Sequence, residues 1–338
     1  MTPSDGRSEG KKEVEEKIRK ELEKANDYYQ TILTCQAFGN IIVYDFKGKV
    51  FISNKFVTSV NNEVAQQREV TPDIVGCSPD FVVVGEIKKS LPREQQYWFD
   101  VLQQLKKYDD NLNAKSNNFN TGDHDIVLII HHTLSRAFKK FFENQKNFIF
   151  KRNFVIVEFG FSPNLEEKIF LRTEYGTFKN KKLQSMLENG LPIPVNRVVD
   201  ELSQLKFIDN EPPVVYTMEV IWLHALGPRS PLKRYRVGGQ KFEIEVSVDD
   251  LHSTLNRFFA PKGTDLPRRA WIRSALDKFT EIGLAVRKTA NTYTIKYGRL
   301  PTKGREIKEF LLWKLFEKER KIESRSSFKG QKRINDFY

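Results

Sequence analysis

The chain has 338 residues, of which 39% are hydrophobic, and this length is enough for about two or three folded units, each with its own core. Its net charge of +12 favours a polyanionic partner such as nucleic acid, although charge alone does not separate this partner from a membrane surface or from simple solubility. Cys35 and Cys77 are the only cysteines and no Cys/His cluster is present, which argues against a disulfide framework or a structural zinc site and suits a reducing compartment.

The chain opens on a polar leader, residues 1–10, followed by a predicted helix from about residue 11 to residue 34. The leader is charged where a signal peptide would be apolar, and no apolar run approaches the ~20 residues of a membrane span. We therefore expect a protein of the cell interior, cytoplasmic or nuclear, that does not associate with a membrane. Residues 40–53 alternate around a Lys-Gly break, which predicts a β-hairpin.

Strands and helices then alternate, which predicts a mixed α/β sheet in a domain of residues 11–175. The strands TPDIVG and FVVVGEIKK come first, and Pro92 opens a helix because proline is favoured in a first helical turn. The Asn-rich residues 111–123 predict a mobile loop because they offer little to bury. A strand, a helix, a strand and an edge strand are expected at residues 125–132, 135–146, 153–162 and 167–178.

The pattern changes near residue 176, where short polar pieces and several prolines predict a linker at residues 176–211. Residues 212–300 contain three helical patterns, the last stopped at Gly283, and then two short alternating runs about a polar turn. Three helices followed by a β-hairpin resemble a winged-helix domain. A charged helix is expected within residues 301–323, and residues 324–338 form a polar tail.

The strand FVVVGEIKK carries charges where an apolar strand would be expected to have none. Glu86 and Lys88 share one face of this strand and Ile87 points to the other. Asp73 leads the preceding strand and reaches the same end if the two strands pair as a hairpin. Two converging carboxylates make a site for Mg²⁺ or Mn²⁺, which can also use the backbone carbonyl of Ile87. Lys88 would then contact the scissile phosphate and orient or help to deprotonate the attacking water.

Pro72-Asp73 followed by Glu86-Ile87-Lys88 resembles the PD-(D/E)xK nuclease superfamily, which includes restriction endonucleases, junction resolvases and RecB-type exonucleases. Its members share an αβββαβ core, and the predicted order of elements matches this core along residues 11–160. The resemblance implies a restriction-endonuclease-like α/β fold, a divalent metal and hydrolysis of DNA phosphodiester bonds by Asp73, Glu86 and Lys88. Many relatives dimerise to cut both strands, so a homodimer is one arrangement that the resemblance allows.

A second motif lies on the helix after this strand. Gln104 and Tyr108 stand four residues apart and therefore share one helix face. This spacing is similar to the QxxxY motif of RecB-like nucleases, in which the glutamine and the tyrosine sit beside the catalytic centre and help to hold the DNA. The resemblance implies that Gln104 and Tyr108 bind DNA.

Some alternatives stay open within the site. Asp80 starts the charged strand, but six residues of strand span ~20 Å, so we interpret it as a turn residue. Many relatives add a carboxylate or histidine from the first helix, and the sequence does not single one out among Glu16, Glu23, Glu63 and Glu69. His131-His132 and Cys77 are interpreted as structural. Glu86 and Lys88 would have no catalytic meaning if they only protected an edge strand from aggregation.

Basic residues decorate the last helix and the hairpin of the predicted winged helix. They can contact phosphates in a DNA groove, the alternative being a solvated face or a surface for protein contacts. The predicted DNA-binding residues here are Arg268, Arg269, Arg273, Lys278, Arg287 and Lys288. The apolar residues Trp271, Ile272, Leu276 and Phe279 are predicted to form the core.

The last eight residues resemble the PIP box, Q-x-x-aliphatic-x-x-aromatic-aromatic, through which replication and repair proteins bind the sliding clamp PCNA. The positions of this motif are filled by Gln331, Ile334, Phe337 and Tyr338. A disordered peptide can order around such anchors on binding. This partner implies an archaeal or eukaryotic host, or a virus of one.

Together these features predict a metal-dependent DNA nuclease that PCNA recruits to replication or repair intermediates. One alternative is a non-catalytic DNA-binding adaptor or regulator with a degenerate nuclease fold. Another is a restriction-type endonuclease, which would give discrete fragments defined by sequence.

Overall fold

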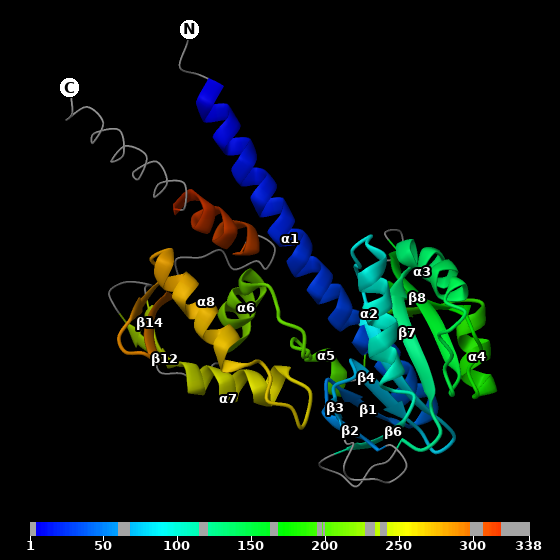
Figure 1. The fold of residues 1–338 in the computed structure, drawn as a ribbon. Coiled ribbons are helices and arrows are strands. Elements are labelled where there is room, and N and C mark those ends of the chain that lie inside the picture. The colour runs from blue at the N-terminus through cyan, green and yellow to red at the C-terminus, as the bar shows by residue number, and fades with distance from the viewer. Residues whose placement is uncertain are drawn as a thin grey trace. The chain divides into compact units, whose positions relative to one another are not determined.

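The computed structural model describes residues 5–59, 68–114, 121–162, 168–194, 198, 200–226, 234–236, 242–297 and 307–318. The chain divides into two compact units (Figure 1), each of which is described by itself. The α/β unit consists of Asp27–Asn210 and Asn256–Leu266, and the smaller unit of Met1–Asn26, Glu211–Leu255 and Pro267–Tyr338.

A seven-stranded mixed sheet forms the centre of the α/β unit, with the strand order β1-β4-β5-β7-β8-β9-β10. The middle strands β5, β7 and β8 are parallel, and the strands on either side of them run antiparallel to their neighbours. The strands are β1 (Lys49–Ile52), β4 (Ile74–Cys77), β5 (Val82–Lys88), β7 (Asp125–His131), β8 (Phe154–Ser162), β9 (Lys168–Tyr175) and β10 (Leu191–Pro194). The middle strands are almost continuously buried, as expected for parallel strands covered on both faces. The predicted α/β class is therefore confirmed.

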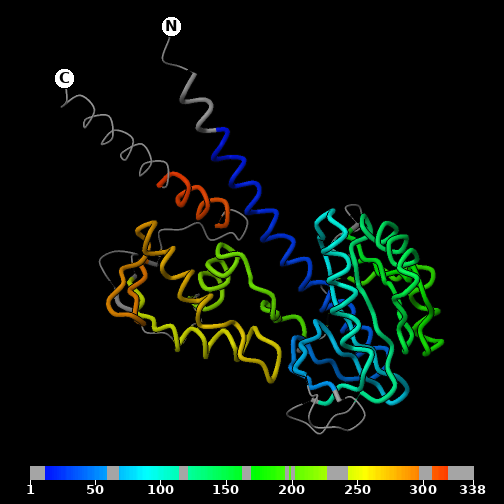
Figure 2. Tube along the Cα trace, in the orientation of Figure 1, coloured from blue at the N-terminus to red at the C-terminus, as the bar shows by residue number. Residues whose placement is uncertain are grey.

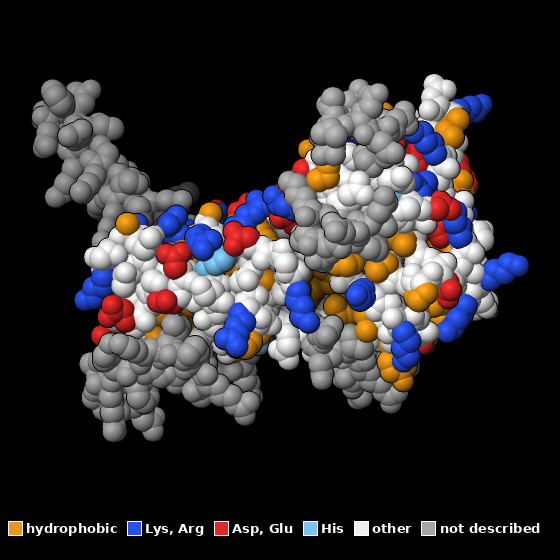
Figure 3. Space-filling model, turned by 90° about the horizontal axis from the view of Figure 1, so that it is seen from below, with side chains coloured by type: hydrophobic (Ala, Val, Ile, Leu, Met, Phe, Trp, Pro, Cys, Tyr) orange, Lys and Arg blue, Asp and Glu red, His pale blue; other side chains and the backbone are white. Residues whose placement is uncertain are grey.

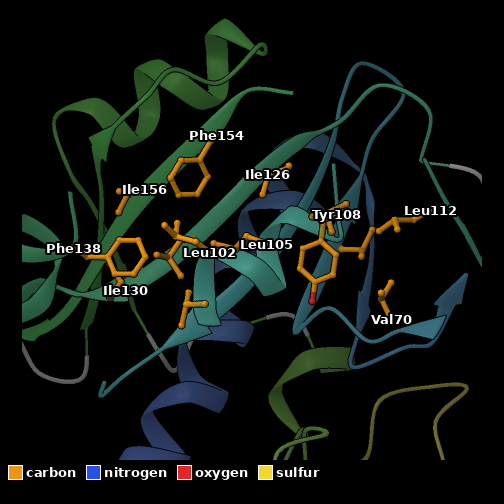
Figure 4. Packing of buried hydrophobic residues seen from close by; sticks show 14 of the residues in the cluster. Val70, Leu102, Leu105, Tyr108, Leu112, Ile126, Ile130, Phe138, Phe154 and Ile156 are labelled. Atoms are coloured by element: carbon orange, nitrogen blue, oxygen red, sulfur yellow. The ribbon is translucent and has the colours of Figure 1, made fainter. Parts of the chain in front are cut away.

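Helices α2 (Gln95–Lys106) and α3 (His132–Asn144) pack on one face of this sheet. Their apolar side chains and those of alternate strand residues form one buried cluster, part of which Figure 4 shows. Leu102 and Leu105 of α2 and Phe138 of α3 are fully buried in it. The cluster fixes the position of α2 relative to β5, and α2 leads into Tyr108.

The other face of the sheet meets the end of the long helix α1 (Asp5–Asn40) and the π-helical turn η1 (Ile41–Asp45). A Cβ atom added to Gly76 of β4 would lie 2.9 Å from the side chain of Ile42, so the glycine allows this close approach. α4 (Lys181–Glu188) packs against β9. A short helix, α5 (Asp200–Ser203), follows β10.

The predicted β-hairpin at residues 40–53 is wrong. The helix continues through Asn40 into η1, and β1 pairs with β4 rather than with a strand directly before it. Ile41 and Ile42 are buried in η1. Two adjacent apolar residues suit a buried helix and a buried strand equally well, so periodicity did not decide between them.

The α/β unit also contains a small three-stranded sheet in the order β3-β2-β6, which the sequence did not predict. Figure 1 labels its strands, and Figure 2 traces the path of the same chain. It consists of β2 (Phe56–Ser59), β3 (Arg68–Val70) and β6 (Asn111–Ala114). The predicted mobile loop at residues 111–123 is therefore wrong for β6. Leu112 is fully buried there, and its backbone N–H bonds to the Thr121 hydroxyl at 3.0 Å.

The predicted linker at residues 176–211 is also wrong over α4 and β10. β10 pairs with β9 and adds a seventh strand, so β9 is not the edge strand that was expected. Leu183, Leu187 and Ile193 are buried and hold the segment to the sheet. They are few and are separated by polar residues, which explains why the segment was interpreted as a linker.

The smaller unit contains helices and a four-stranded sheet in the order β11-β12-β14-β13. Its elements are α6 (Val214–Val220), the π-helical η4 (Ile221–Ala225), β11 (Arg234–Arg236), β12 (Phe242–Ser247), α7 (Val248–Phe259), which extends into the α/β unit, α8 (Arg269–Glu281), β13 (Ala285–Arg287) and β14 (Thr292–Tyr297). The predicted hairpin after α8 is confirmed, as is the end of that helix at Gly283, whose φ is +76°. Trp271, Ile272, Leu276 and Phe279 are buried, as predicted.

Residues 307–318 are helical, within the predicted charged helix at 301–323. Among the described residues, no helix combines the length and the apolar character that crossing a bilayer requires.

Candidate active site

The candidate site lies where β4 begins and β5 ends. The predicted antiparallel pairing of these strands is present, with Ile74 opposite Gly85. Asp73 therefore lies beside the last residues of β5, and its Oδ2 atom accepts a 2.8 Å hydrogen bond from the backbone N–H of Ile87. Strand pairing thus brings together a carboxylate and a charged strand end that are 13 residues apart in the sequence (86 − 73 = 13).

Lys88 joins the two carboxylates. Its Nζ atom donates a 2.8 Å hydrogen bond to Oε2 of Glu86 and lies 3.9 Å from Oδ2 of Asp73. Glu86 and Lys88 share a strand face, as the strand period requires. The structure therefore brings together all three residues that were predicted to be catalytic.

The two carboxylates are almost fully shielded from solvent. Asp73 is 4% exposed and Glu86 is 1% exposed. Burial raises the pKa of Glu86 to about 8 and the Asp73 carboxylate adds to this effect, whereas Lys88 and Tyr108 act in the opposite direction. Burial and the Asp73 charge therefore favour a proton on Glu86, whereas the contacts with Lys88 and Tyr108 favour the ionised carboxylate.

The positive charge of Lys88 is held firmly. Burial alone would lower the pKa of its ammonium group, but the Glu86 and Asp73 carboxylates outweigh burial and raise this pKa above the usual range. Lys88 is therefore a permanent cation beside the carboxylates.

The predicted QxxxY pair also lies at this site. Tyr108 follows α2, and its hydroxyl donates a hydrogen bond to Oε1 of Glu86. The side chain of Gln104 in turn hydrogen-bonds to Tyr108. In Figure 4 the ring of Tyr108 stands among the apolar side chains of the cluster. Burial, and then the neighbouring Glu86, raise the pKa of Tyr108 well above its ordinary value, so its hydroxyl stays a donor.

The donor set suits a hard divalent cation in part. Asp73 and Glu86 are oxygen ligands of the kind that Mg²⁺ and Mn²⁺ prefer, and their mutual repulsion favours a shared cation. In the described part of the chain, no group of three or more His, Cys, Asp or Glu side chains is arranged to hold a metal ion. Water or substrate oxygens would have to complete the coordination. The ligand role of the Ile87 carbonyl stays a prediction.

The first helix contributes residues that the sequence did not single out. Cys35 of α1 is fully buried, and burial followed by the charges of Asp73 and Glu86 raises the pKa of its thiol well above the ordinary value. Asp27 interacts electrostatically with Lys89, the residue after Lys88. The helical pattern of α1 predicts an apolar face but does not tell which polar residues face the site.

The structure describes the surroundings of three of the four alternatives for an upstream carboxylate. Glu69 pairs with Lys55 at 2.7 Å in the small sheet. Glu16 pairs with Arg19 at 2.8 Å in the half of α1 that belongs to the smaller unit, and Glu23 is exposed in the same half. Glu63 lies outside the described residues.

The interpretation of Asp80 as a turn residue is confirmed. Its backbone N–H bonds to the Ser78 hydroxyl at 3.3 Å, and the side chain is exposed just before β5. It therefore stands at the opposite end of the strand from Glu86.

The histidine pair lies at the end of β7, at the same edge of the sheet: His131 is the last residue of β7 and His132 the first of α3. The His131 and His132 ring centroids are 4.3 Å apart, and Nδ1 of His131 lies 2.9 Å from the Thr133 hydroxyl. Burial, and then the charge of Lys89, lower the pKa of His131 to about 4. His131 is therefore neutral at pH 7 and does not attract a phosphate by charge.

The predicted DNA-binding cations of the smaller unit lie on α8, at its N-cap and in the following hairpin. Most of them contact an acidic, polar or aromatic side chain of the same unit. Arg269 bonds to Asp249 at 2.8 Å and Lys278 to Glu281 at 2.8 Å. The remaining contacts are Arg287 to Asp277 at 3.6 Å, Arg273 to Asn291 at 3.0 Å and Arg268 over the ring of Trp271 at 5.2 Å. Lys288 lies in the hairpin turn.

The mixture of charges is visible on the protein surface. On the face shown in Figure 3, Lys and Arg side chains are interspersed with Asp and Glu side chains and do not form a single patch. Gln331, Ile334, Phe337 and Tyr338 lie outside the described residues, so the PIP box stays a prediction.

Comparison of the chain with protein-family models, with curated proteins and with solved structures finds no match.

Proposed function

We propose that the α/β unit is a divalent-metal-dependent nuclease that hydrolyses phosphodiester bonds in DNA. The observation that carries this proposal is the convergence of Asp73, Glu86 and Lys88 at the ends of two paired strands. The element order α1, β1, β4, β5, α2 and β7, with the small sheet as an insertion, supports the resemblance to the αβββαβ nuclease core.

The charges of the site favour this chemistry. When both carboxylates are ionised, they and one ammonium group sum to −1, and one divalent cation would bring the site to +1. A bound cation would favour the ionised form of Glu86 and so oppose the burial that raises its pKa. A net positive site suits the anionic phosphodiester. When bound, Mg²⁺ or Mn²⁺ would act as a Lewis acid on the phosphate.

The chain's own groups would then have separate roles. Asp73 and Glu86 would hold the cation, and the Ile87 amide would keep Asp73 in place. Lys88 would stabilise developing negative charge and orient the attacking water. Because the carboxylates keep Lys88 protonated, we assign it no role as a general base.

The QxxxY pair divides into two roles in this proposal. Tyr108 is only 1% exposed and its hydroxyl is engaged with Glu86, so it would orient Glu86 rather than contact DNA. Gln104 is half-buried and is the member of the pair that can reach a DNA strand. The smaller unit would supply further DNA contacts as a winged helix through α8 and its hairpin, and the tail would recruit PCNA and raise the local concentration of the nuclease.

A non-catalytic DNA-binding adaptor is the second candidate, and the burial of the carboxylates favours it. Asp73 and Glu86 are closed off from solvent, and Lys88 already neutralises Glu86 by a direct hydrogen bond. Such a closed arrangement would be expected of a degenerate site that has lost its metal.

Cleavage assays separate these candidates. Labelled single-stranded, duplex, flapped and forked DNA would be incubated with the full chain and Mg²⁺, Mn²⁺ or EDTA. We expect metal-dependent cutting that falls by roughly 10²- to 10⁴-fold in Lys88→Ala. It should survive in Lys89→Ala, because Lys89 lies beyond the end of β5 and its charge interacts with Asp27 and His131. DNA binding without cutting under either metal would favour the adaptor.

The PCNA proposal has its own test. A chain ending at Gly330 should cut DNA at the basal rate of the full chain but should lose any stimulation by added PCNA. A variant with Phe337 and Tyr338 changed to alanine is the matched control for chain length. Equal stimulation of all three proteins would show that the tail is not the recruiting segment.

A further inference from the structure

The turn after α2 carries Tyr108 into the candidate site, and it is tied down on several sides. The backbone N–H groups of Tyr108 and Asp109 close the turn onto Leu105 at 2.9 Å and Lys106 at 3.1 Å. The Asp109 carboxylate accepts hydrogen bonds from the backbone N–H groups of Lys151 at 2.8 Å and Arg152 at 3.0 Å. The turn is therefore anchored to the segment directly before β8.

His124 supplies a further anchor, directly on Tyr108. Its ring is fully buried just before β7, with Nε2 at 2.7 Å from the Tyr108 carbonyl oxygen and Nδ1 at 3.3 Å from the Gly122 carbonyl oxygen. Burial, and then the charge of Arg152, lower the pKa of His124 to about 4, so the ring is neutral at pH 7. A neutral imidazole has one N–H, and the shorter contact assigns it to Nε2.

We infer that His124 is a positioning residue of the active site, which acts through Tyr108 on Glu86. The Nε2–H group bonds to the Tyr108 backbone, and the Tyr108 hydroxyl bonds to Glu86. This inference rests on the proposed function, because it assigns His124 a role only if Glu86 holds a metal ion.

The geometry explains why the hydrogen bond from His124 to the Tyr108 carbonyl matters for the site as well as for the fold. The tyrosine ring is held by the apolar cluster, which resists tilting but is not directional. The hydrogen bond from His124 is directional. It fixes the position of the Tyr108 backbone, and therefore of the Tyr108 hydroxyl, relative to the apolar cluster. Misplacement of a positioning group by ~1 Å can cost roughly 10²-fold in rate.

Substitutions at His124 can separate the directional bond from packing. His124→Gln keeps an N–H donor near the position of Nε2, whereas His124→Asn places its amide near Nδ1 and leaves the Tyr108 carbonyl without this donor. His124→Leu keeps an apolar side chain in the space but removes both polar contacts. Phe138→Leu is the packing control, since it loosens the same apolar cluster without touching this hydrogen-bonded series.

Mn²⁺ affinity of the full chain, measured by calorimetry without DNA, is the main readout, and kcat and KM for DNA cleavage are the second. We expect His124→Asn and His124→Leu to weaken Mn²⁺ binding by roughly 10-fold, because they displace Tyr108, the outer partner of the proposed metal ligand Glu86. His124→Gln should restore most of the affinity. Phe138→Leu should lower thermal stability and leave Mn²⁺ affinity close to that of the unmodified chain.

Tyr108→Phe provides the decisive background, because it removes the hydroxyl through which His124 is proposed to act. In that background, His124→Leu should change Mn²⁺ affinity by less than twofold. Full additivity of the two substitutions would overturn the inference, as would equal affinities of the Leu, Asn and unmodified proteins. If the unmodified chain binds no Mn²⁺ and cuts no DNA, the proposed function itself fails, which is a different result.

Discussion

The two units of this protein both place cations beside carboxylates, but in opposite settings. In the α/β unit, Lys88 has an 18% exposed side chain and bonds to Glu86, which is 1% exposed. In the smaller unit, Arg269 and Asp249 are 47% and 60% exposed. Exposed pairs contribute about 0–1 kcal/mol and are easily exchanged, whereas a buried pair is costly to break. The same charge pattern therefore predicts a fixed site in one unit and an exchangeable surface in the other.

Matched amide substitutions should show the largest difference between the two units. Glu86→Gln removes a proposed metal ligand without changing its size, so we expect DNA cleavage to fall by at least roughly 10²-fold. Asp249→Asn removes the charge that pairs with Arg269 at 2.8 Å and should change cleavage by less than about twofold, with DNA binding unchanged or slightly tighter. Cleavage rates and binding curves at one salt concentration check both.

Comparable losses in the two variants would contradict the distinction between a fixed site and an exchangeable surface. Circular dichroism and thermal melts of both proteins are the control for folding.

The next largest effect is expected in the pH dependence of protein stability and of Mn²⁺ affinity, both of which involve Glu86. The pKa of Glu86 in the folded protein, about 8, lies above the ordinary value of 4.5, so the folded state binds this proton more tightly than the unfolded state. Stability of the metal-free protein should therefore fall as pH rises from about 4.5 to about 8. Because Mn²⁺ displaces the same proton, its affinity should rise by up to about tenfold per pH unit below about 8.

Thermal melts in EDTA and Mn²⁺ titrations from pH 5 to pH 9 measure these trends. Glu86→Gln should flatten the change in stability, and Asp249→Asn should leave it as it is in the unmodified chain. A Glu86→Gln curve parallel to that of the unmodified chain would show that Glu86 is not the titrating group.

The smallest effect is expected in the salt dependence of DNA binding by the smaller unit. If Arg269 and Arg273 exchange their present partners for DNA phosphates, each alanine substitution should weaken DNA binding a few-fold at physiological salt. Each should also lower the slope of log affinity against log salt by about 1. Lys288→Ala tests the hairpin turn in the same way.

DNA affinity measured across a range of salt concentrations gives these slopes. Unchanged slopes in all of these variants would remove α8 and its hairpin from the proposed DNA interface. Lys24→Ala, which removes an exposed lysine paired with Glu21 on α1, is a matched control for net charge.

The residues that the sequence predicted at the site share a simple geometric basis. Strand parity places Glu86 and Lys88 together, and the hairpin pairing adds Asp73. The short spacing between Gln104 and Tyr108 brings them together too, although α2 ends at Lys106 and Tyr108 lies in the turn after it and not, as predicted, on the helix. Each of these relations involves residues a few positions apart or one pair of adjacent strands, so the local sequence pattern is enough to predict it.

The residues that were missed depend on longer-range packing. Cys35 and His124 reach the site only because α1 and the start of β7 pack around it, and no local pattern reports that packing. The same reason applies to β6, whose polar sequence gains its structure by pairing with β2. Tertiary contacts overrode the local preference in each case.

The hydrogen bond from the Ile87 amide to Asp73 has a consequence for observing this protein. A backbone N–H that is hydrogen-bonded to a side chain exchanges with solvent deuterium only when this hydrogen bond breaks or the strand opens. The exchange rate of the Ile87 amide therefore reports whether the Asp73 carboxylate keeps its hydrogen bond, and the measurement needs neither a substrate nor an attached probe. Comparison with and without Mn²⁺ would follow the assembly of the site in solution.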